Sequence, residues 1–189
     1  MKNFLKLKSV IQYCSESDRP ILETTYSRLS PYFSENNLKT LRHSTINTDI
    51  NHSNILIQFN EDMNDYTVSG IIDYNDIDYD CLIFELGISV AYLLLTVDDN
   101  LIQAAGKLIA GYHSVLPITE MEYKGLPTII MARLFQSIVI ANHQYFKDSG
   151  NEYIMTKYDK KWEVLKLFLS TPLDEIFAVW NKIIEPPIQ

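Results

Sequence analysis

Hydrophobic residues recur at helical spacing near both ends of the chain and follow a strand-like pattern only in its centre. Residues 4–14 carry apolar side chains on one helical face, and a second helical pattern covers residues 21–33, where Pro31 is expected to kink or restart the helix. Further along, apolar stripes cover residues 84–95 and 101–112. The pattern predicts a mainly α-helical chain.

Polar positions indicate where the later helices begin. Thr119 with Glu122 has the spacing of a capping box. A long helix is expected over residues 127–145, because its apolar residues keep a helical period. Thr171 precedes a proline and an acidic residue, which predicts the N-cap of a final helix.

Two short central segments are rich in β-branched and apolar residues, namely residues 54–59 and 67–72. Turn-forming polar residues fill positions 60–66 between them, so an antiparallel hairpin is expected. If the hairpin is symmetric about its turn, Asn54 and Asp73 are cross-strand neighbours at its open end.

Charge and composition narrow the class of protein. The 24 acidic and 16 basic residues give a formal charge of −8, which argues against nucleic-acid and anionic-membrane partners. The longest apolar run, 86–97, is shorter than the roughly 20 residues that a bilayer requires. Cys14 and Cys81 are too few for a disulfide framework or a Cys-based zinc site. We expect a soluble, cytoplasmic protein.

Three oxygen-bearing side chains are expected to meet at the open end of the hairpin: Asp49, Asn54 and Asp73. Such a cluster suits a hard cation such as Mg²⁺, which takes few protein ligands and leaves coordination sites for phosphate oxygens. The spacing D-x-x-x-x-N, followed by an Asp after a hairpin, is typical of protein-kinase-like phosphotransferases. It indicates Asp49 as the catalytic base and Asn54 and Asp73 as metal ligands. The alternative is that these are turn and capping residues around an ordinary hairpin.

The segments 47–57 and 69–76 resemble the catalytic-loop and metal-loop motifs of aminoglycoside phosphotransferase-like kinases. Within that superfamily the chain most resembles the hydroxylysine kinase family, whose loop has the form H-G-D-x-N-x-x-N. Five further stretches agree with that family: 84–86, 108–112, 116–119, 132–137 and 151–155. The resemblance implies the C-terminal lobe of a kinase-like fold, mainly α with a small β-hairpin. It also implies phosphorylation of the side-chain hydroxyl of 5-hydroxy-L-lysine, with GTP (or ATP) as donor and Mg²⁺ as cofactor.

The chain departs from this family immediately before the catalytic Asp. The family's His-Gly is Asn47-Thr48 here, and the family's His braces the metal loop. The Asn47 amide can donate and accept hydrogen bonds, so we expect it to replace part of that brace. Asn51 is also expected to be a loop-supporting residue.

The chain also departs from the family in lacking the sequence features of a nucleotide-binding lobe. The chain has six glycines and no G-x-G, and too few residues precede Asp49 for a nucleotide-binding lobe. We therefore expect only the substrate-binding lobe, which would contact a missing N-terminal lobe. Within it we expect a helical lead-in (1–44), a catalytic loop with a metal-binding hairpin (45–80) and a helical subdomain (81–189). Two alternatives stay open: a non-catalytic remnant that acts as a binding or regulatory module, and a kinase for a related aminoglycoside-like or choline-like molecule.

Four charged residues are candidates for contact with an amino-acid substrate. Asp76 and Asp78 would neutralise the ammonium groups of a diamino acid, or belong to a solvated acidic loop. Glu85 would contact the substrate, or would favour the start of a helix through the helix dipole. Arg133 would pair with the substrate carboxylate or with an internal acid.

Overall fold

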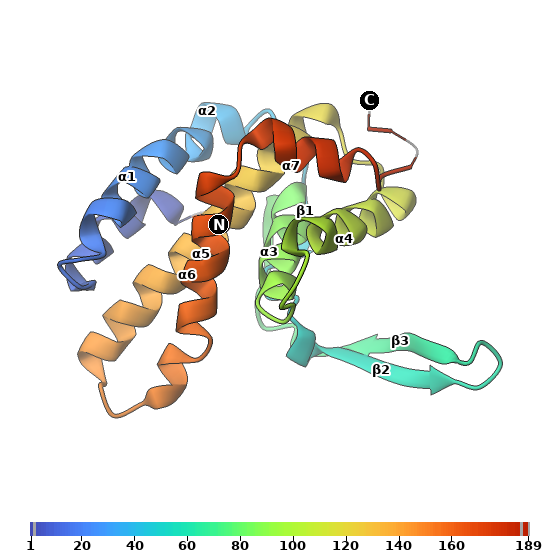
Figure 1. Cartoon of the computed structure of the whole chain (residues 1–189), viewed down its shortest axis with the longest axis horizontal. Helices are drawn as coiled ribbons and strands as arrows, with labels where there is room; N and C mark the ends of the chain where they lie inside the picture. Colours follow the sequence, from blue (N-terminus) through green and yellow to red (C-terminus); the bar gives the residue numbers. More distant parts are fainter. Residues whose placement is uncertain (2, 186, 189) are drawn as a thin grey trace.

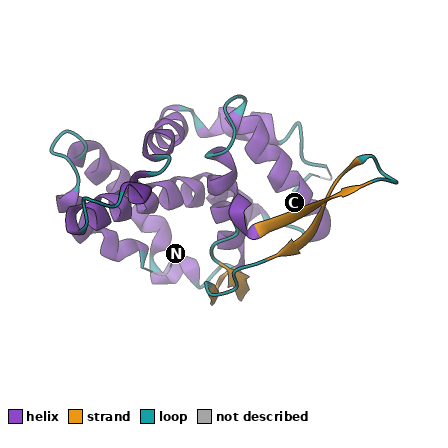
Figure 2. Cartoon of the chain, turned by 90° about the horizontal axis from the view of Figure 1, so that it is seen from below, coloured by secondary structure: helices purple, strands orange, loops and turns teal. Residues whose placement is uncertain are grey.

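The computed structural model describes residues 1, 3–185 and 187–188, and its centre is one long helix, α5 (Glu120–Lys147). Other helical segments pack around α5, and a hairpin projects from the helical body (Figures 1 and 2). The segments in contact with α5 are η1 (Phe4–Tyr13), α1 (Arg19–Leu29), α3 (Leu82–Leu94), η4 (Glu152–Met155) and α6 (Tyr158–Ser170). The remaining ones are η2 (Ser30–Phe33), α2 (Glu35–Leu38), η3 (His52–Asn54), α4 (Leu101–Val115) and α7 (Leu173–Trp180). The prediction of a mainly helical fold is confirmed.

Large apolar side chains from both halves of the chain form the core around α5. The Phe4 ring lies 4.3 Å from Phe33 and 5.6 Å from Phe135, measured between ring centroids. Helices α3 and α5 approach closely at Gly87, where a β-carbon would lie 3.0 Å from the Ile129 Cβ. This close crossing requires a residue without a side chain on α3.

The apolar character of α5 follows from its central position. By length and composition alone, α5 could cross a bilayer. The apolar run named from the sequence, 86–97, is a different and shorter segment. However, 67% of the most apolar window of α5 is buried inside the protein. That degree of burial is typical of the core helix of a folded domain.

The structure contains two small antiparallel sheets of two strands each. The predicted hairpin is confirmed as β2 (Ile55–Asn60) paired with β3 (Asp65–Ile71). The second sheet, β1 (His43–Asn47) paired with β4 (Ile77–Cys81), was not predicted. Its strands are short and polar, so their sequences lack the apolar alternation that marks a strand.

Two predicted helix starts were wrong. Helix α5 begins at Glu120 because the Thr119–Glu122 capping box, which is present, starts this same helix, and Pro127 lies inside it. The N-cap of α7 is Pro172, and the Thr171 hydroxyl instead donates to the Leu167 carbonyl of α6, 2.8 Å away. Thr171 is therefore the C-cap of α6, a helix that the sequence pattern does not predict.

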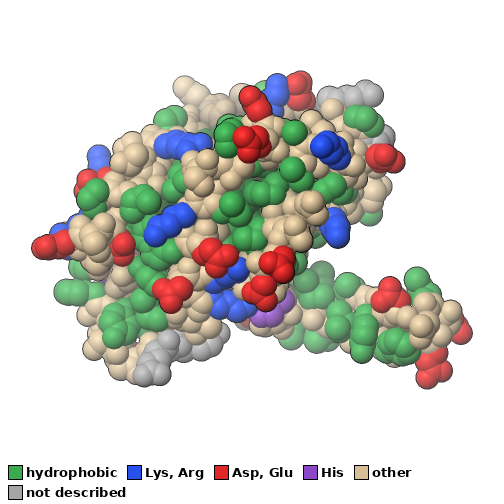
Figure 3. Space-filling view, in the orientation of Figure 1, with side chains coloured by type: hydrophobic (Ala, Val, Ile, Leu, Met, Phe, Trp, Pro, Cys, Tyr) green, Lys and Arg blue, Asp and Glu red, His purple; other side chains and the backbone are tan. Residues whose placement is uncertain are grey.

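The β2–β3 hairpin carries apolar side chains that the rest of the chain leaves exposed. Ile57, Met63 and Val68 are 62%, 66% and 65% exposed. Within the ribbon, the Phe59 and Tyr66 rings form an edge-to-face pair at 5.3 Å. Figure 3 shows hydrophobic side chains along the projecting hairpin.

Candidate active site

The catalytic-loop segment and the metal-loop segment are tied together at both ends. The Thr48 amide and the Thr48 hydroxyl each donate to the Asp76 carbonyl at 3.0 Å, which extends the β1–β4 pairing. At the other end the Ile72 amide donates to the Asn54 carbonyl at 2.9 Å, which extends the hairpin. The loops that carry Asp49 and Asp73 are therefore held side by side.

The expected pairing of Asn54 with Asp73 was wrong by one residue. The turn lies earlier than expected, since Asn60 pairs with Asp65, and that register alone would place Asn54 opposite Ile71. A bulge between Ile57 and Leu56 adds a residue to β3, so Asn54 lies opposite Ile72. Asp73 follows immediately, with a positive φ of 60°. Its exposed carboxylate accepts a hydrogen bond from the Asn75 side chain at 3.0 Å.

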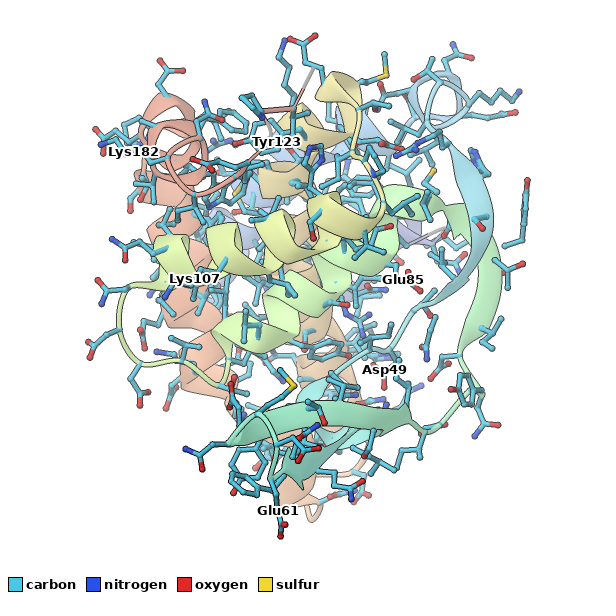
Figure 4. The ribbon with its side chains drawn as sticks, turned by 90° about the vertical axis from the view of Figure 1, so that its right-hand side faces the viewer. Asp49, Glu61, Glu85, Lys107, Tyr123 and Lys182 are labelled. Carbon is cyan, nitrogen blue, oxygen red and sulfur yellow. The ribbon has the colours of Figure 1, made fainter. Side chains whose placement is uncertain are left out.

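Asp49 lies between the hairpin and the helical body, and its half-buried carboxylate is held by several donors (Figure 4). Its Oδ1 accepts from the Tyr92 hydroxyl at 2.5 Å and from Arg133 Nη2 at 3.5 Å. Its Oδ2 accepts from Asn51 Nδ2 at 2.9 Å. Asn54 Nδ2 lies 3.4 Å from the same Oδ2, so four protein donors surround a carboxylate that offers about four lone-pair positions, and a substrate hydroxyl would compete with them.

Asn54 is buried, and its side-chain amide braces the Asp49 loop. Its Nδ2 donates to the Asp49 carbonyl at 3.0 Å and lies 3.4 Å from Asp49 Oδ2. No hydrogen bond to Asn54 Oδ1 is present among the described residues, so this oxygen is available to a cation. The Asn51 side chain donates to Asp49 and accepts from the Ser53 amide at 2.9 Å, so it links Asp49 to the following turn.

The structure corrects the expected role of Asn47. Its Oδ1 accepts from the Asp49 amide at 2.9 Å, so it braces the catalytic loop and not the metal loop. Its buried Nδ2 has no hydrogen-bond partner within the described part of the chain. Thr48, the other departure from the family pattern, is the residue that ties down the metal loop through Asp76.

Glu85 and Arg133 both support the Asp49 region. Glu85 lies in the first turn of α3 and accepts a hydrogen bond from the Asn47 amide at 2.8 Å. Arg133 on α5 pairs with Asp49, which is the internal acid that the sequence left open, and also donates to the Tyr92 hydroxyl. Burial is the main cause that raises the pKa of Tyr92, which therefore stays a neutral donor to Asp49.

Asp76 and Asp78 are exposed and line none of the hollows that reach Asp49. The Asp76 main chain belongs to the tie with Thr48, and the Asp78 side chain accepts from the Tyr79 amide at 2.8 Å. Their proposed contact with substrate stays a prediction.

Two hollows meet at the Asp49 loop and share Asn51, His52 and Tyr92. One is a mostly apolar cavity of about 320 Å³ between this loop and helices α3 and α4. The other is a polar cleft of about 620 Å³ that includes Asp49 and runs to α5 and the start of α6. The sequence does not predict Tyr92 or the α6 residues of this cleft as site residues, because no motif links them to Asp49.

The chemical types of the donors near Asp49 suit a cation that is shared with phosphate. Within the described residues there is no group of three or more His, Cys, Asp and Glu side chains that could hold a metal ion. The Asn54 Oδ1 and the Asp73 carboxylate are hard oxygen donors on loops that are held together. Mg²⁺ is commonly bound by one or two carboxylates together with substrate phosphates, so this small set suits it.

Comparison with known proteins places this geometry in a kinase context. The chain is 30% identical over 149 residues to hydroxylysine kinase from Xenopus laevis, a match that covers 76% of this chain and 40% of that protein. It is 29% identical to the Mus musculus and 31% identical to the Bos taurus hydroxylysine kinases, each over 136 residues, 70% of this chain and 36% of the relative. The chain is a distant, partial relative of the hydroxylysine kinases.

The match spans about 40% of the length of the Xenopus relative. No family model matches the chain. The mainly helical fold with small antiparallel sheets is consistent with one lobe of a kinase fold.

Proposed function

We propose that this chain is the acceptor-binding lobe of a small-molecule kinase that phosphorylates the hydroxyl of 5-hydroxy-L-lysine. The observation that carries the proposal is the position of Asp49, at the edge of a polar cleft and bonded to Asn54 beside the metal loop. The partial relationship to hydroxylysine kinases supports the choice of acceptor.

In this proposal Asp49 accepts the proton of the acceptor hydroxyl as its oxygen attacks the terminal phosphorus of the donor. Tyr92, Arg133 and Asn51 hold the carboxylate in place, which reduces the reorganisation needed for proton transfer. Asn54 Oδ1 and the Asp73 carboxylate would hold Mg²⁺, which neutralises charge on the phosphates of GTP or ATP when it is bound.

The exposed apolar hairpin fits a lobe that functions within a larger protein. Ile57, Met63 and Val68 are solvent-exposed in this chain, and an exposed apolar ribbon is commonly a contact surface. We propose that the hairpin packs on another part of the intact kinase, and that the intact kinase works in the cytoplasm.

A non-catalytic binding module is the second candidate, and one observation favours it. Both oxygens of Asp49 already accept hydrogen bonds from the protein, as in a structural carboxylate. The two candidates differ in turnover, since both allow the cleft to bind an amino acid.

The test is phosphoryl transfer from GTP or ATP to 5-hydroxy-L-lysine with Mg²⁺, followed by phosphorus NMR. The chain would be assayed alone and joined to the nucleotide-binding part of the Xenopus hydroxylysine kinase. We expect negligible transfer by the chain alone and measurable transfer by the joined protein. Asp49→Asn should lower the rate of the joined protein by about 10²- to 10⁴-fold, because it removes the base.

Two outcomes would contradict the proposal. Near-normal turnover by Asp49→Asn would remove the assignment of the base. A joined protein that binds both nucleotide and hydroxylysine but transfers no phosphoryl group would favour the binding module.

A further inference from the structure

The polar cleft beside Asp49 has a basic far wall. Helix α5 contributes Ser137 and Gln144 to it, and the start of α6 contributes Lys157 and Lys161. A smaller hollow of about 170 Å³ shares Ser137, Gln144 and Lys161 with the cleft and adds Arg133. The cations of α5 and α6 thus gather on one side of Asp49, and Figure 3 shows basic side chains between α6 and the base of the hairpin.

This local charge is opposite to that of the whole chain, whose formal charge is −8. Asp49 is the only carboxylate among the residues that line the cleft, and it is already paired with Arg133. Lys161 forms no ion pair with any side chain that the structure describes. A half-buried ammonium near a guanidinium is stabilised when an anion binds between them.

Desolvation and the nearby guanidinium act on Lys161 in the same direction. Burial, and secondly the charge of Arg133, lower the pKa of Lys161 from its ordinary value. Ser137 and Gln144 add polar groups that form no side-chain hydrogen bond within the described part of the chain. This wall therefore offers a cation and two neutral hydrogen-bonding groups to a ligand.

The cleft is separate from the side where phosphate is expected. Neither Asn54 nor Asp73 lines it, so a cation and donor phosphates held by those residues would lie outside it. An acceptor whose hydroxyl reaches Asp49 extends the rest of its carbon chain along the cleft. In hydroxylysine a short methylene chain separates the hydroxyl carbon from the carbon that carries the carboxylate.

We propose that Lys161, with Ser137 and Gln144, binds the carboxylate of the amino-acid acceptor and is a specificity-determining residue of this lobe. The inference rests on the proposed function and deepens it. The sequence suggested Arg133 as the partner of the substrate carboxylate, but Arg133 is already bonded to Asp49 and Tyr92, so we assign this contact to Lys161.

The test measures binding to the chain itself by calorimetry, so that it does not depend on turnover. The probes are 5-hydroxy-L-lysine and its carboxamide, which differs only at the carboxylate. We expect the carboxamide to bind about 10- to 100-fold more weakly, the range for one charge-assisted contact. Lys161→Met should weaken the binding of hydroxylysine by a similar factor and remove the preference for hydroxylysine over its carboxamide. Lys161→Arg should retain part of that preference.

A matched control changes the same charge elsewhere. Lys107→Met alters an exposed residue of α4, away from the cleft, and should keep both the affinity and the preference (Figure 4). Thermal melting of each variant checks that it is folded.

The outcomes separate this inference from the proposed function. If Lys161→Met is folded and still prefers hydroxylysine over its carboxamide, the carboxylate site is wrong and the kinase proposal stands. If other amino acids bind in a Lys161-dependent way but hydroxylysine does not, the site stands and the proposed acceptor is wrong. If inorganic phosphate or Mg-GTP competes at Lys161 while the carboxamide binds as well as hydroxylysine, the wall binds phosphate and the inference is overturned. If no amino acid binds, both proposals fail.

Discussion

The crossing of α3 and α5 gives a sharp test of the packing that supports the site. Gly87 on α3 faces Ile129 on α5, and a methyl group at position 87 would overlap the Ile129 Cγ2 atom. Ile129 is fully buried, so it has little freedom to move away. The same crossing places Tyr92 and Arg133, each about one turn further along its helix, against Asp49.

The magnitude for Gly87→Ala follows from two opposing effects. Alanine in a helix interior is favoured over glycine by about 1 kcal/mol. Overpacking of a rigid core costs about 1–3 kcal/mol, and a direct overlap with a buried side chain belongs at the upper end. We therefore expect Gly87→Ala to lower the free energy of unfolding by about 1–2 kcal/mol.

Gly111→Ala is the matched control, because Gly111 lies in α4 and a β-carbon there meets no atom within 4 Å. Gly111→Ala should show only the higher helix propensity of alanine and stabilise the chain by about 1 kcal/mol. The two variants should then differ by about 2–3 kcal/mol in urea denaturation. At about 2–4 °C per kcal/mol for a chain of this size, their Tm values should differ by about 4–12 °C.

A second substitution identifies the contact itself. Ile129→Ala removes the atom that the new methyl group meets, at a cost of about 2–5 kcal/mol for the cavity. Because the Gly87→Ala methyl group would partly fill that cavity, the double variant should be more stable than the sum of the single effects. If Gly87→Ala stabilised the chain as much as Gly111→Ala, the close approach of α3 and α5 would be refuted.

Two further predictions concern residues that tie elements together. Burial disfavours the Glu122 carboxylate, but hydrogen bonds from Arg42 (2.8 and 2.6 Å) and Thr119 outweigh this and lower the pKa of Glu122 below its ordinary 4.5. A lowered pKa stabilises the fold above pH 4.5, and this stabilisation is lost as the pH falls through the folded-state value. Glu122→Gln should cost about 1–3 kcal/mol at pH about 7 and less in acid, and an equal cost at both pH values in urea denaturation would contradict this. Thr48→Val keeps the side-chain shape and the backbone hydrogen bond to Asp76 but loses the hydroxyl hydrogen bond, so it should lower the free energy of unfolding by about 0.5–1.5 kcal/mol. Thr48→Ser keeps the hydroxyl and should lower it less. Equal melting temperatures of Thr48→Val and the parent chain would show that the hydroxyl bond contributes nothing.

Local sequence signals were sufficient wherever one short segment determines the structure. The turn formers between two β-branched runs predicted the β2–β3 hairpin, and Thr119 with Glu122 predicted a capping box. These features depend on neighbours in the sequence. By contrast, the predicted start of α5 at Pro127 is wrong: a proline commonly marks a helix boundary, but here the capping box sets the first turn and Pro127 lies inside the helix.

Features that depend on distant segments were not visible in the sequence. The β1–β4 sheet joins polar strands whose sequences carry no alternation, and only their pairing makes them strands. The predicted pairing of Asn54 with Asp73 is off by one residue because the turn is centred earlier than a symmetric hairpin requires, and the bulge in β3 makes up only part of the difference. Tyr92 on α3 contacts Asp49 and Lys161 on α6 lines the same cleft because both helices pack on α5, which no local spacing encodes.

The replacement of His-Gly by Asn47-Thr48 shows how the structure changes the meaning of a sequence departure. From sequence, Asn47 was the substitute for the missing histidine, and Thr48 had no role. In the structure the two residues brace different loops: Asn47 accepts a hydrogen bond from the Asp49 amide, and Thr48 donates to the Asp76 carbonyl of the metal loop. Because both loops remain braced, the loss of the His-Gly pair is no argument by itself against phosphoryl transfer. Activity therefore depends on Asp49, whose carboxylate must accept a substrate hydroxyl in addition to the donors that already hold it.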